Sequence, residues 1–439
     1  MGSEEFIREA IWHGEIDRAE QILAESPELA SADIRIAAIL GDDAAVRACI
    51  ANDPKSVNAK SPPYGGDALN YLGLSKYLRL DPTRTPAFVR TATALLDAGA
   101  DPNTGFWTTG EYPEYESAMY GAAGVAHNPE VTRLLLERGA DPNDVEVVYH
   151  SPETRDNRVI ELLVETGKLT SESLAIMLIR KIDWHDYAGV KYLLEHGAPA
   201  DGERKRGWMA LHHALARSND TIVFERLLDH GAQPNVVANG ITAVARAARE
   251  GRTDVLAAFA RRGHHVELSG VDALISLCAH GDTDGARALL ASDPRLQNDL
   301  MAMSGTVLAN FAGNANASGV RSLIDVGVSV ASPFAEGDAY FGIPKGSLAI
   351  HVAAWHAHPE TVKVLVERGS PVNIKDANGN TPLMLAVRAC VDSYWMARRS
   401  SDSVAALIAA GASTSGVQFP CGYPEVDVLL GAAIRELQR

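Results

Sequence analysis

The stretch LAIHVAAWHAHPETVKVLVERGSPVNIKD, residues 348–376, decides the fold of this chain. It predicts a short apolar helix over residues 350–354, a break at His358 and Pro359, and a second helix over residues 360–368 that ends at Gly369. An extended turn then leads to Asp376. Because neither helix can bury its apolar face alone, we expect the unit to stack against copies of itself.

Related units recur along the rest of the chain. The pentapeptide GADPN closes two of them, at residues 99–103 and 139–143, and GAQPN closes another at residues 231–235. These motifs resemble the ankyrin-repeat consensus, TPLHxAAxxGHxxVVxLLLxxGADVNxxDxxG, which recurs about every 33 residues. The resemblance covers nearly the whole chain and implies an all-α ankyrin-repeat solenoid of about twelve units. In such a solenoid, stacked helix-turn-helix units with β-turn fingers curve around a concave groove.

The repeats divide the chain into three predicted regions. Residues 1–60 resemble N-terminal capping repeats, because their turns contain proline where later units have Gly-Ala-Asp. Residues 61–416 are predicted to form repeats with irregular finger and helix-break insertions. Residues 417–439 end the chain with a capping helix, expected over residues 425–438. His212 and His351 occupy the family's Leu-His position, where the resemblance implies structural hydrogen bonds between repeats.

Composition limits the classes of partner. The formal net charge of −16 argues against nucleic acid, whose phosphates require clustered lysine and arginine. No window approaches the roughly 18 uninterrupted apolar residues of a membrane span. The four cysteines are scattered without metal-ligand spacing, which fits a reducing cytoplasm and predicts no metal site and no other cofactor. The excess of arginine over lysine, together with abundant alanine, indicates a bacterial source.

The resemblance also implies where a partner would bind. Recognition positions in the family include the two residues after the paired alanines of an inner helix, which selects Trp355 and His356 in the opening stretch. We expect both side chains to face solvent, because the recognition positions of the family do. Exposed aromatic residues are good candidates for binding, since aromatic residues dominate binding hot spots. Carrying the family's recognition positions over to other units selects Arg217, Arg249, His280, Asn314 and Arg388.

The insertions add aromatic residues where regular fingers are short and polar. Long irregular loops in a compact fold are more often functional than decorative, so we include these side chains among the binding candidates. The alternative is that they pack onto their own fingers. The candidates are Trp107, Tyr112 and Tyr115 after the first GADPN, Tyr340 and Phe341 in a later finger, Trp184 and Trp395 at helix breaks, and Trp208 on a turn.

The leading hypothesis is therefore a cytoplasmic binding protein that recognises a protein or peptide through its groove. The alternative is a small-molecule or carbohydrate-binding array, whose acidic residues beside aromatic side chains could also act as an acid and base pair. Four carboxylates are candidates for that chemistry: Glu111, Glu114, Glu116 and Asp338. No known catalytic motif is present, so the sequence favours a binding protein over an enzyme.

Overall fold

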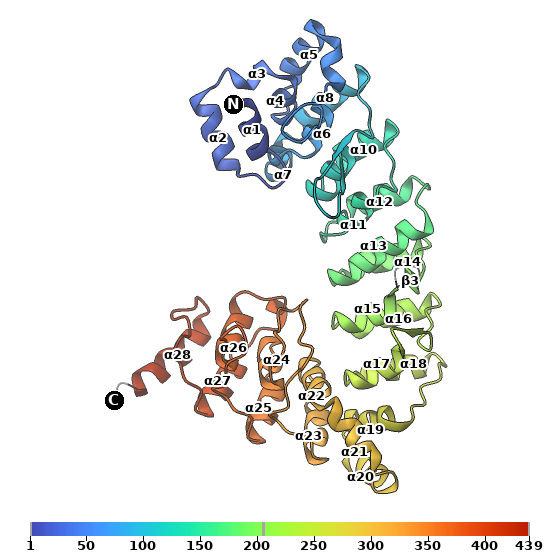
Figure 1. Cartoon of the computed structure of the whole chain (residues 1–439), viewed down its shortest axis with the longest axis vertical. Coiled ribbons are helices and arrows are strands. Elements are labelled where there is room, and N and C mark those ends of the chain that lie inside the picture. The colour runs from blue at the N-terminus through green and yellow to red at the C-terminus, as the bar shows by residue number, and fades with distance from the viewer. Residues whose placement is uncertain (1, 204–206, 438–439) are drawn as a thin grey trace. The chain divides into compact units, whose positions relative to one another are not determined.

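The protein is described by a computed structural model that covers residues 2–203 and 207–437. It divides into two compact units, residues 1–232 and residues 233–439. Both units consist mainly of helices arranged in successive antiparallel pairs, an inner helix followed by an outer one (Figure 1). The mostly helical repeat architecture predicted from the sequence is confirmed.

The first unit contains seven helix pairs among the described residues, α1/α2, α4/α5, α6/α8, α9/α10, α11/α12, α13/α14 and α15/α16. Two antiparallel strand pairs, β1–β2 and β3–β4, form fingers between them. The elements are α1 Gly2–Ala10, α2 Ile16–Glu25, α3 Leu29–Ala32, α4 Ile34–Ile39, α5 Asp43–Asn52, η1 Pro54–Asn58, α6 Ala68–Gly73, α7 Lys76–Leu80, η2 Pro82–Arg84, α8 Thr85–Asp97, β1 Gly105–Trp107, β2 Tyr115–Ser117, α9 Ala118–Tyr120, η3 Gly121–Val125, α10 Pro129–Glu137, α11 Val145–His150, α12 Arg158–Glu165, α13 Ser171–Asp183, α14 Tyr187–Glu195, β3 Gly202–Glu203, β4 Trp208–Met209, α15 Ala210–Ala216 and α16 Thr221–Asp229.

The second unit contains five pairs among its described residues, α17/α18, α19/α20, α22/α23, α24/α25 and α26/α27, with one strand pair, β5–β6, and a last helix, α28. The expected C-terminal helix is thus present, although Gln438 lies outside the described residues. The elements are β5 Val237–Ala238, β6 Ile241–Thr242, α17 Ala243–Arg249, α18 Thr253–Arg261, α19 Gly270–Ala279, α20 Thr283–Ser292, α21 Arg295–Ala302, α22 Ser304–Gly313, α23 Ala317–Asp325, α24 Ala349–Trp355, α25 Pro359–Glu367, α26 Pro382–Val391, η4 Met396–Arg398, α27 Asp402–Ala409 and α28 Pro424–Leu437.

Helix ends follow from the local sequence. Several outer helices begin after an Asp or Asn whose side chain accepts the backbone N–H three residues on, as Asn128 does from Val131 at 3.0 Å. Eight glycines that follow the C-terminal ends of helices, among them Gly369 as predicted, have positive φ, between 78° and 105°. They are Gly99, Gly139, Gly197, Gly231, Gly263, Gly327, Gly369 and Gly411.

The asparagine of the repeat turn joins one repeat to the next. The Nδ2 of Asn103 donates to the carbonyl oxygen of Gly139 at 3.2 Å, while its Oδ1 accepts from the backbone N–H of Asp141 at 2.8 Å. Asn373 makes the same pair of bonds in the second unit, to Gly411 at 3.0 Å and from Ser413 at 2.7 Å. The asparagine is therefore retained in the turn because it satisfies two backbone groups of its neighbour.

Three α-helices occur where the sequence predicted none, and the first is α3, which follows the first helix pair. Helix α7 lies within the insertion of the third repeat, and α21 follows α20 before the next pair begins. The three short strand pairs likewise add a small β component to the predicted all-α fold. The boundaries predicted at residues 60 and 416 separate kinds of repeat and stay predictions.

Candidate ligand-binding pockets

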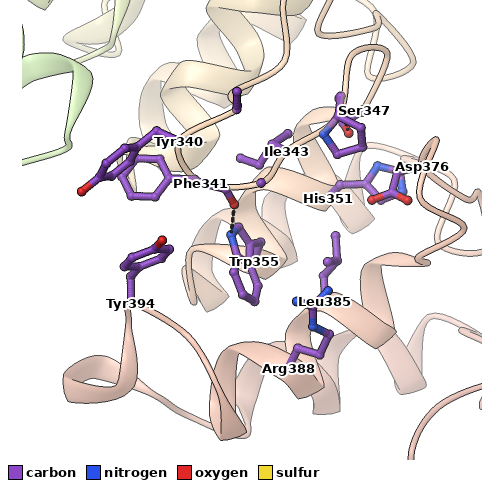
Figure 2. A pocket seen from close by; sticks show the side chains of 13 residues that line it. Tyr340, Phe341, Ile343, Ser347, His351, Trp355, Asp376, Leu385, Arg388 and Tyr394 are labelled. Carbon is purple, nitrogen blue, oxygen red and sulfur yellow. Dashed lines mark hydrogen bonds between the residues drawn. The ribbon is translucent and has the colours of Figure 1, made fainter. Parts of the chain in front are cut away.

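An aromatic pocket of about 230 Å³ lies in the second unit, between the finger that precedes α24 and the segment that follows α26 (Figure 2). The finger, residues 331–346, supplies Tyr340 and Phe341. Helices α24 and α26 supply Trp355 and Leu385, and the insertion after α26 supplies Tyr394. Tyr340 and Tyr394 stack across the opening, with ring centroids 6.0 Å apart and planes 20° from parallel. The two irregular segments on either side of residues 348–376 therefore meet at one site.

Trp355 does not face solvent, and that expectation was wrong. Its side chain is 7% exposed, and its indole N–H donates to the carbonyl oxygen of Phe341 at 2.8 Å. The finger covers the position that is open in a regular repeat, so Trp355 forms a wall of the pocket. Its role in binding stays a prediction.

His356 is also buried, at 3% exposure, which contradicts the expectation that it faces solvent. Its Nδ1 lies 3.0 Å from the carbonyl oxygen of Gly313, and Nε2 of His358 lies 2.9 Å from the same oxygen. Burial lowers the pKa of His356 well below its usual value and that of His358 to about 3, with the charge of Arg398 adding to both shifts. Both imidazoles are thus neutral donors that tie α24 to the end of α22.

The polar groups of the aromatic pocket differ in whether they already have partners. His351 accepts the backbone N–H of Leu348 at 3.0 Å and lies 3.1 Å from the carbonyl oxygen of Ile374, so its bonds are structural but stay within its own stretch, residues 348–376, where bonds between repeats were expected. Asp376 accepts the backbone N–H groups of two residues in its own turn, at 2.8 and 2.9 Å. The guanidinium of Arg388 lies 5.1 Å from the centre of the Trp355 ring and forms no hydrogen bond or ion pair with any described residue.

Trp395 lies behind the aromatic pocket and does not line it. The side chain is 6% exposed and packs between Phe341 and His356, with ring centroids 5.0 and 4.6 Å away. The guanidinium of Arg398 lies 4.1 Å from the centre of the Trp395 ring. Trp395 therefore joins its insertion to the finger of residues 331–346 and to the end of α24, and its role in binding stays a prediction.

A second, larger cavity of about 700 Å³ lies in the first unit beside the finger formed by β1 and β2, and we call it the finger cavity. Trp107 pairs with Tyr115 across the two strands, and their ring centroids are 5.2 Å apart. Trp107 remains 64% exposed, and Tyr112 at the tip of the finger is 80% exposed. Of the two aromatic side chains that line the cavity, Trp107 is therefore open to solvent and Tyr115 is half-buried.

The four predicted catalytic carboxylates lie in different surroundings within their own units. Glu114 lines the finger cavity, whereas Glu111 is exposed and does not line it. Glu116 is 1% exposed, and burial, reinforced by the charges of Glu146 and Glu114, raises its pKa to about 7. Asp338, in the second unit, accepts the backbone N–H groups of Tyr340 and Phe341 at 3.0 and 3.2 Å, so it shapes its own finger.

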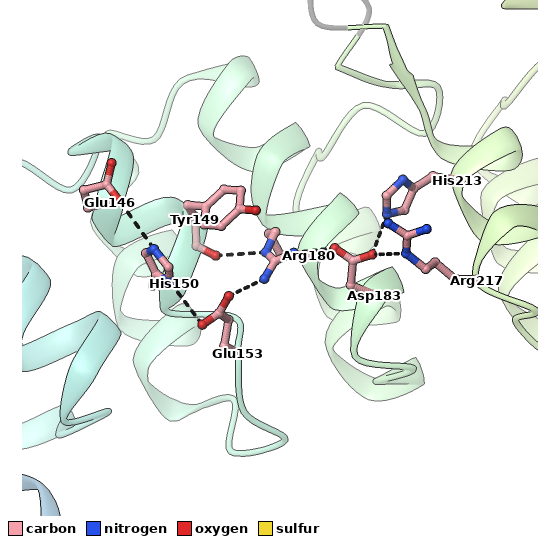
Figure 3. Close-up of polar contacts among 8 residues, drawn as sticks. All are labelled: Glu146, Tyr149, His150, Glu153, Arg180, Asp183, His213 and Arg217. Carbon is pink, nitrogen blue, oxygen red and sulfur yellow. Dashed lines mark hydrogen bonds and ion pairs between the residues drawn. The ribbon is translucent and has the colours of Figure 1, made fainter. Parts of the chain in front are cut away.

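An ion-pair network crosses three successive inner helices of the first unit (Figure 3). Near α11, His150 lies 3.0 Å from a carboxylate oxygen of Glu153, which also pairs with Arg180 of α13. Arg180 reaches Asp183 at 2.5 Å. Asp183 in turn accepts from His213 of α15 and from Arg217, the residue after α15, both at 2.7 Å. Arg217, which the resemblance selected for recognition, is thus engaged with its own neighbours.

The charges of this network shift the pKa values of its members, as His150 and Asp183 illustrate. Burial alone would lower the pKa of His150, but hydrogen bonds and charges from Glu146 and Glu153 outweigh it and raise the pKa to about 9. Burial would raise the pKa of Asp183, yet the bonds from His213 and Arg217 lower it. His150 is therefore a cation and Asp183 an anion at neutral pH.

The spacing of charged residues in the sequence is the signal that indicates this network. Asp183 and Arg217 carry opposite charges and lie 34 residues apart, which is about one repeat. Residues at equal positions of adjacent repeats lie side by side in a stacked array, so opposite charges at that spacing predict an ion pair.

The remaining predicted positions are spread over both units. Trp184 is exposed at the end of α13, and Trp208 is half-buried on β4 with its ring 6.5 Å from that of Tyr149. In the second unit, Arg249 pairs with Asp272 at 2.5 Å, and Asn314 donates to the carbonyl oxygen of Glu250 at 3.1 Å. His280 is exposed beside its own helix. None of these five lines the aromatic pocket or the finger cavity.

No group of three or more His, Cys, Asp or Glu side chains in residues 2–203 and 207–437 is arranged to hold a metal ion. Over the same ranges, no helix combines the length and the apolar character needed to cross a membrane.

Comparison with known families accounts for the repeated helix pairs and turns. Models of ankyrin repeats match residues 176–270 and residues 344–386, the second of which contains α24, α25 and the start of α26. The chain is an ankyrin-repeat protein. Ankyrin repeats generally mediate protein–protein interaction.

Similar proteins match only short parts of the chain. An ankyrin repeat protein of fowlpox virus is 41% identical over 49 residues, which are 11% of this chain and 26% of the viral protein. An ankyrin repeat-containing protein of Schizosaccharomyces pombe is 32% identical over 79 residues, 17% of this chain and 38% of the yeast protein. The chain thus spans less than half the length of either relative. Neither is bacterial, so the expected bacterial source stays a prediction.

Among solved structures, the ankyrin repeat domain of human ASB11 aligns with 53% of this chain and 96% of its own length. Its sequence identity is 20% and its TM-score 0.23.

Proposed function

We propose that this ankyrin-repeat protein binds a protein or peptide partner and that the aromatic pocket is the centre of the binding surface. The observation that carries the proposal is the meeting of two irregular insertions, residues 331–346 and 391–402, around Trp355. A volume of about 230 Å³ lies below the roughly 300–1,000 Å³ of small-molecule sites. It suits a single side chain of a larger partner. The predicted solenoid, its concave groove and the cytoplasmic location belong to the same proposal.

The test fills the pocket without disturbing its walls. A library of random peptides displayed on phage is selected against the immobilised full chain, and the selected peptides are titrated against two variants. Ala339 lines the pocket and is exposed, so Ala339→Trp blocks the opening. Ala335 is exposed on the same finger outside the pocket, so Ala335→Trp is the matched control. At least tenfold weaker binding to Ala339→Trp alone supports the proposal, and equal binding to both variants overturns it.

A second candidate function is the binding of a small molecule, such as a carbohydrate, in the finger cavity. Its volume of about 700 Å³ falls within the roughly 300–1,000 Å³ of ligand sites. Trp107 and Tyr115 offer aromatic faces, and the carboxylates of Glu114 and Glu146 offer hydrogen-bond acceptors. A thermal-shift screen of mono- and oligosaccharides tests it. A hit lost in Trp107→Ala and kept in Tyr112→Ala supports this function, because Tyr112 lies outside the cavity.

A further inference from the structure

The walls of the aromatic pocket favour an apolar side chain. Phe341, Ile343, Trp355 and Leu385 present carbon surface, and the indole N–H of Trp355 is already bonded to Phe341. Aromatic rings bind other rings or aliphatic groups through offset and edge-to-face contacts. The interior of the pocket therefore selects a large aliphatic or aromatic side chain.

Only one charged group of the lining lacks a polar partner within the described residues. Both side-chain nitrogens of His351 are engaged, and burial lowers its pKa, so it is neutral. The carboxylate of Asp376 accepts two backbone N–H groups. Arg388 is exposed, and its guanidinium contacts the Trp355 ring without a hydrogen bond or ion pair.

Stacking against an aromatic ring uses the face of a guanidinium and leaves the N–H groups at its edge for a ligand. A planar carboxylate matches two of those N–H groups at once, which a neutral amide oxygen cannot do as strongly. The charge of Arg388 thus complements an anion placed at the mouth of an apolar pocket.

We propose that the aromatic pocket receives an apolar side chain of a partner peptide while Arg388 binds a carboxylate beside that side chain. The inference rests on the proposed peptide-binding function and names the chemistry of its ligand. The carboxylate has two sources, an acidic residue next to the apolar one or the C-terminus of the peptide.

Three peptides separate these sources on the full chain. Acetyl-Gly-Ser-Phe with a free C-terminus carries a terminal carboxylate, and acetyl-Gly-Phe-Asp amide carries one on a side chain. Acetyl-Gly-Ser-Phe amide carries none. Their affinities are measured by isothermal titration and by saturation-transfer NMR, at peptide concentrations up to about 1 mM.

We expect at least one acidic peptide to bind about tenfold more tightly than the amide, as a charged hydrogen bond allows. In Arg388→Gln, that acidic peptide should bind no more tightly than the amide peptide. In Arg388→Lys, part of the difference in affinity between the two peptides should remain. Arg435→Gln is the matched control, since Arg435 is exposed on α28 away from the pocket. The acidic peptide that binds identifies the source of the carboxylate.

Equal binding of the acids and the amide, or an acid affinity unchanged in Arg388→Gln, overturns the assignment of the carboxylate. Absence of binding by all three peptides overturns it as well. The proposed function fails separately, when phage-selected peptides bind Ala339→Trp as well as they bind the original chain.

Discussion

The indole N–H of Trp355 donates to the carbonyl oxygen of Phe341 at 2.8 Å, and this bond joins helix α24 to the finger that covers it. The finger therefore does not hang free from the repeat. It is anchored at its centre by the residue that a regular repeat would offer to a partner, and the surface available for binding moves to the mouth of the aromatic pocket.

Removing only this N–H should loosen the finger. In Trp355→Phe the ring is retained, but the buried carbonyl of Phe341 loses its donor, which costs about 1–3 kcal/mol. We expect a lower urea midpoint, followed by circular dichroism, and faster amide exchange in the finger. Trp107→Phe is the control, because Trp107 is 64% exposed and surface substitutions usually change stability by about 0.5 kcal/mol or less. Equal loss in both variants would contradict the anchoring role.

The repeat itself was predictable because its determinants are local. The glycine turns and the bonds of His351 all depend on residues within about one 33-residue period. The burial of Trp355 was not predictable, because it depends on where the finger of residues 331–346 folds back. That insertion has no counterpart in the consensus. The pairing of Arg217 with Asp183 lies between these cases, since it needed only a comparison of charges one repeat apart.

Replacing a strained residue at a helix break should stabilise the protein. Ala315, between α22 and α23, has φ of 59°, a left-handed conformation that costs an L-residue about 1–2 kcal/mol. Its side chain is exposed, so Ala315→Gly relieves strain without removing buried contacts. After the entropic cost of glycine, about 0.5–1 kcal/mol, the net gain should approach 1 kcal/mol. Ala288→Gly, at an exposed position inside α20, should instead destabilise by about 1 kcal/mol. A thermal midpoint that falls in both variants would refute the strain.

Asp183 holds the ion-pair network together. Asp183→Asn removes the charge that faces Arg180, His213 and Arg217, and leaves cations close to one another. Breaking a buried pair costs about 3–5 kcal/mol, and the partial exposure of Arg217 places this loss near the lower end. Hydrogen exchange should report the loss as weaker protection of α13 and α15. Asp156→Asn, in an exposed pair with Arg158, should leave their protection unchanged. If α13 and α15 are protected from exchange in Asp183→Asn as well as in the original chain, the network contributes no net stability.

The carboxyl of Glu116 should make the first unit less stable as the pH rises. Burial raises its folded-state pKa to about 7 from an ordinary value of 4.5, so the folded chain binds the proton more tightly than the unfolded chain. Its stability contribution is therefore complete below pH 4.5 and is lost as the pH rises through 7, by about 3 kcal/mol in all. Glu116→Gln is neutral at every pH and removes this loss. The variant should gain stability over the original chain between pH 5 and pH 8, as measured by urea midpoints at each pH. Glu111→Gln, at an exposed site on the same finger, is the control and should follow the original chain. Parallel pH profiles for Glu116→Gln and the original chain would show that Glu116 is ionised when folded.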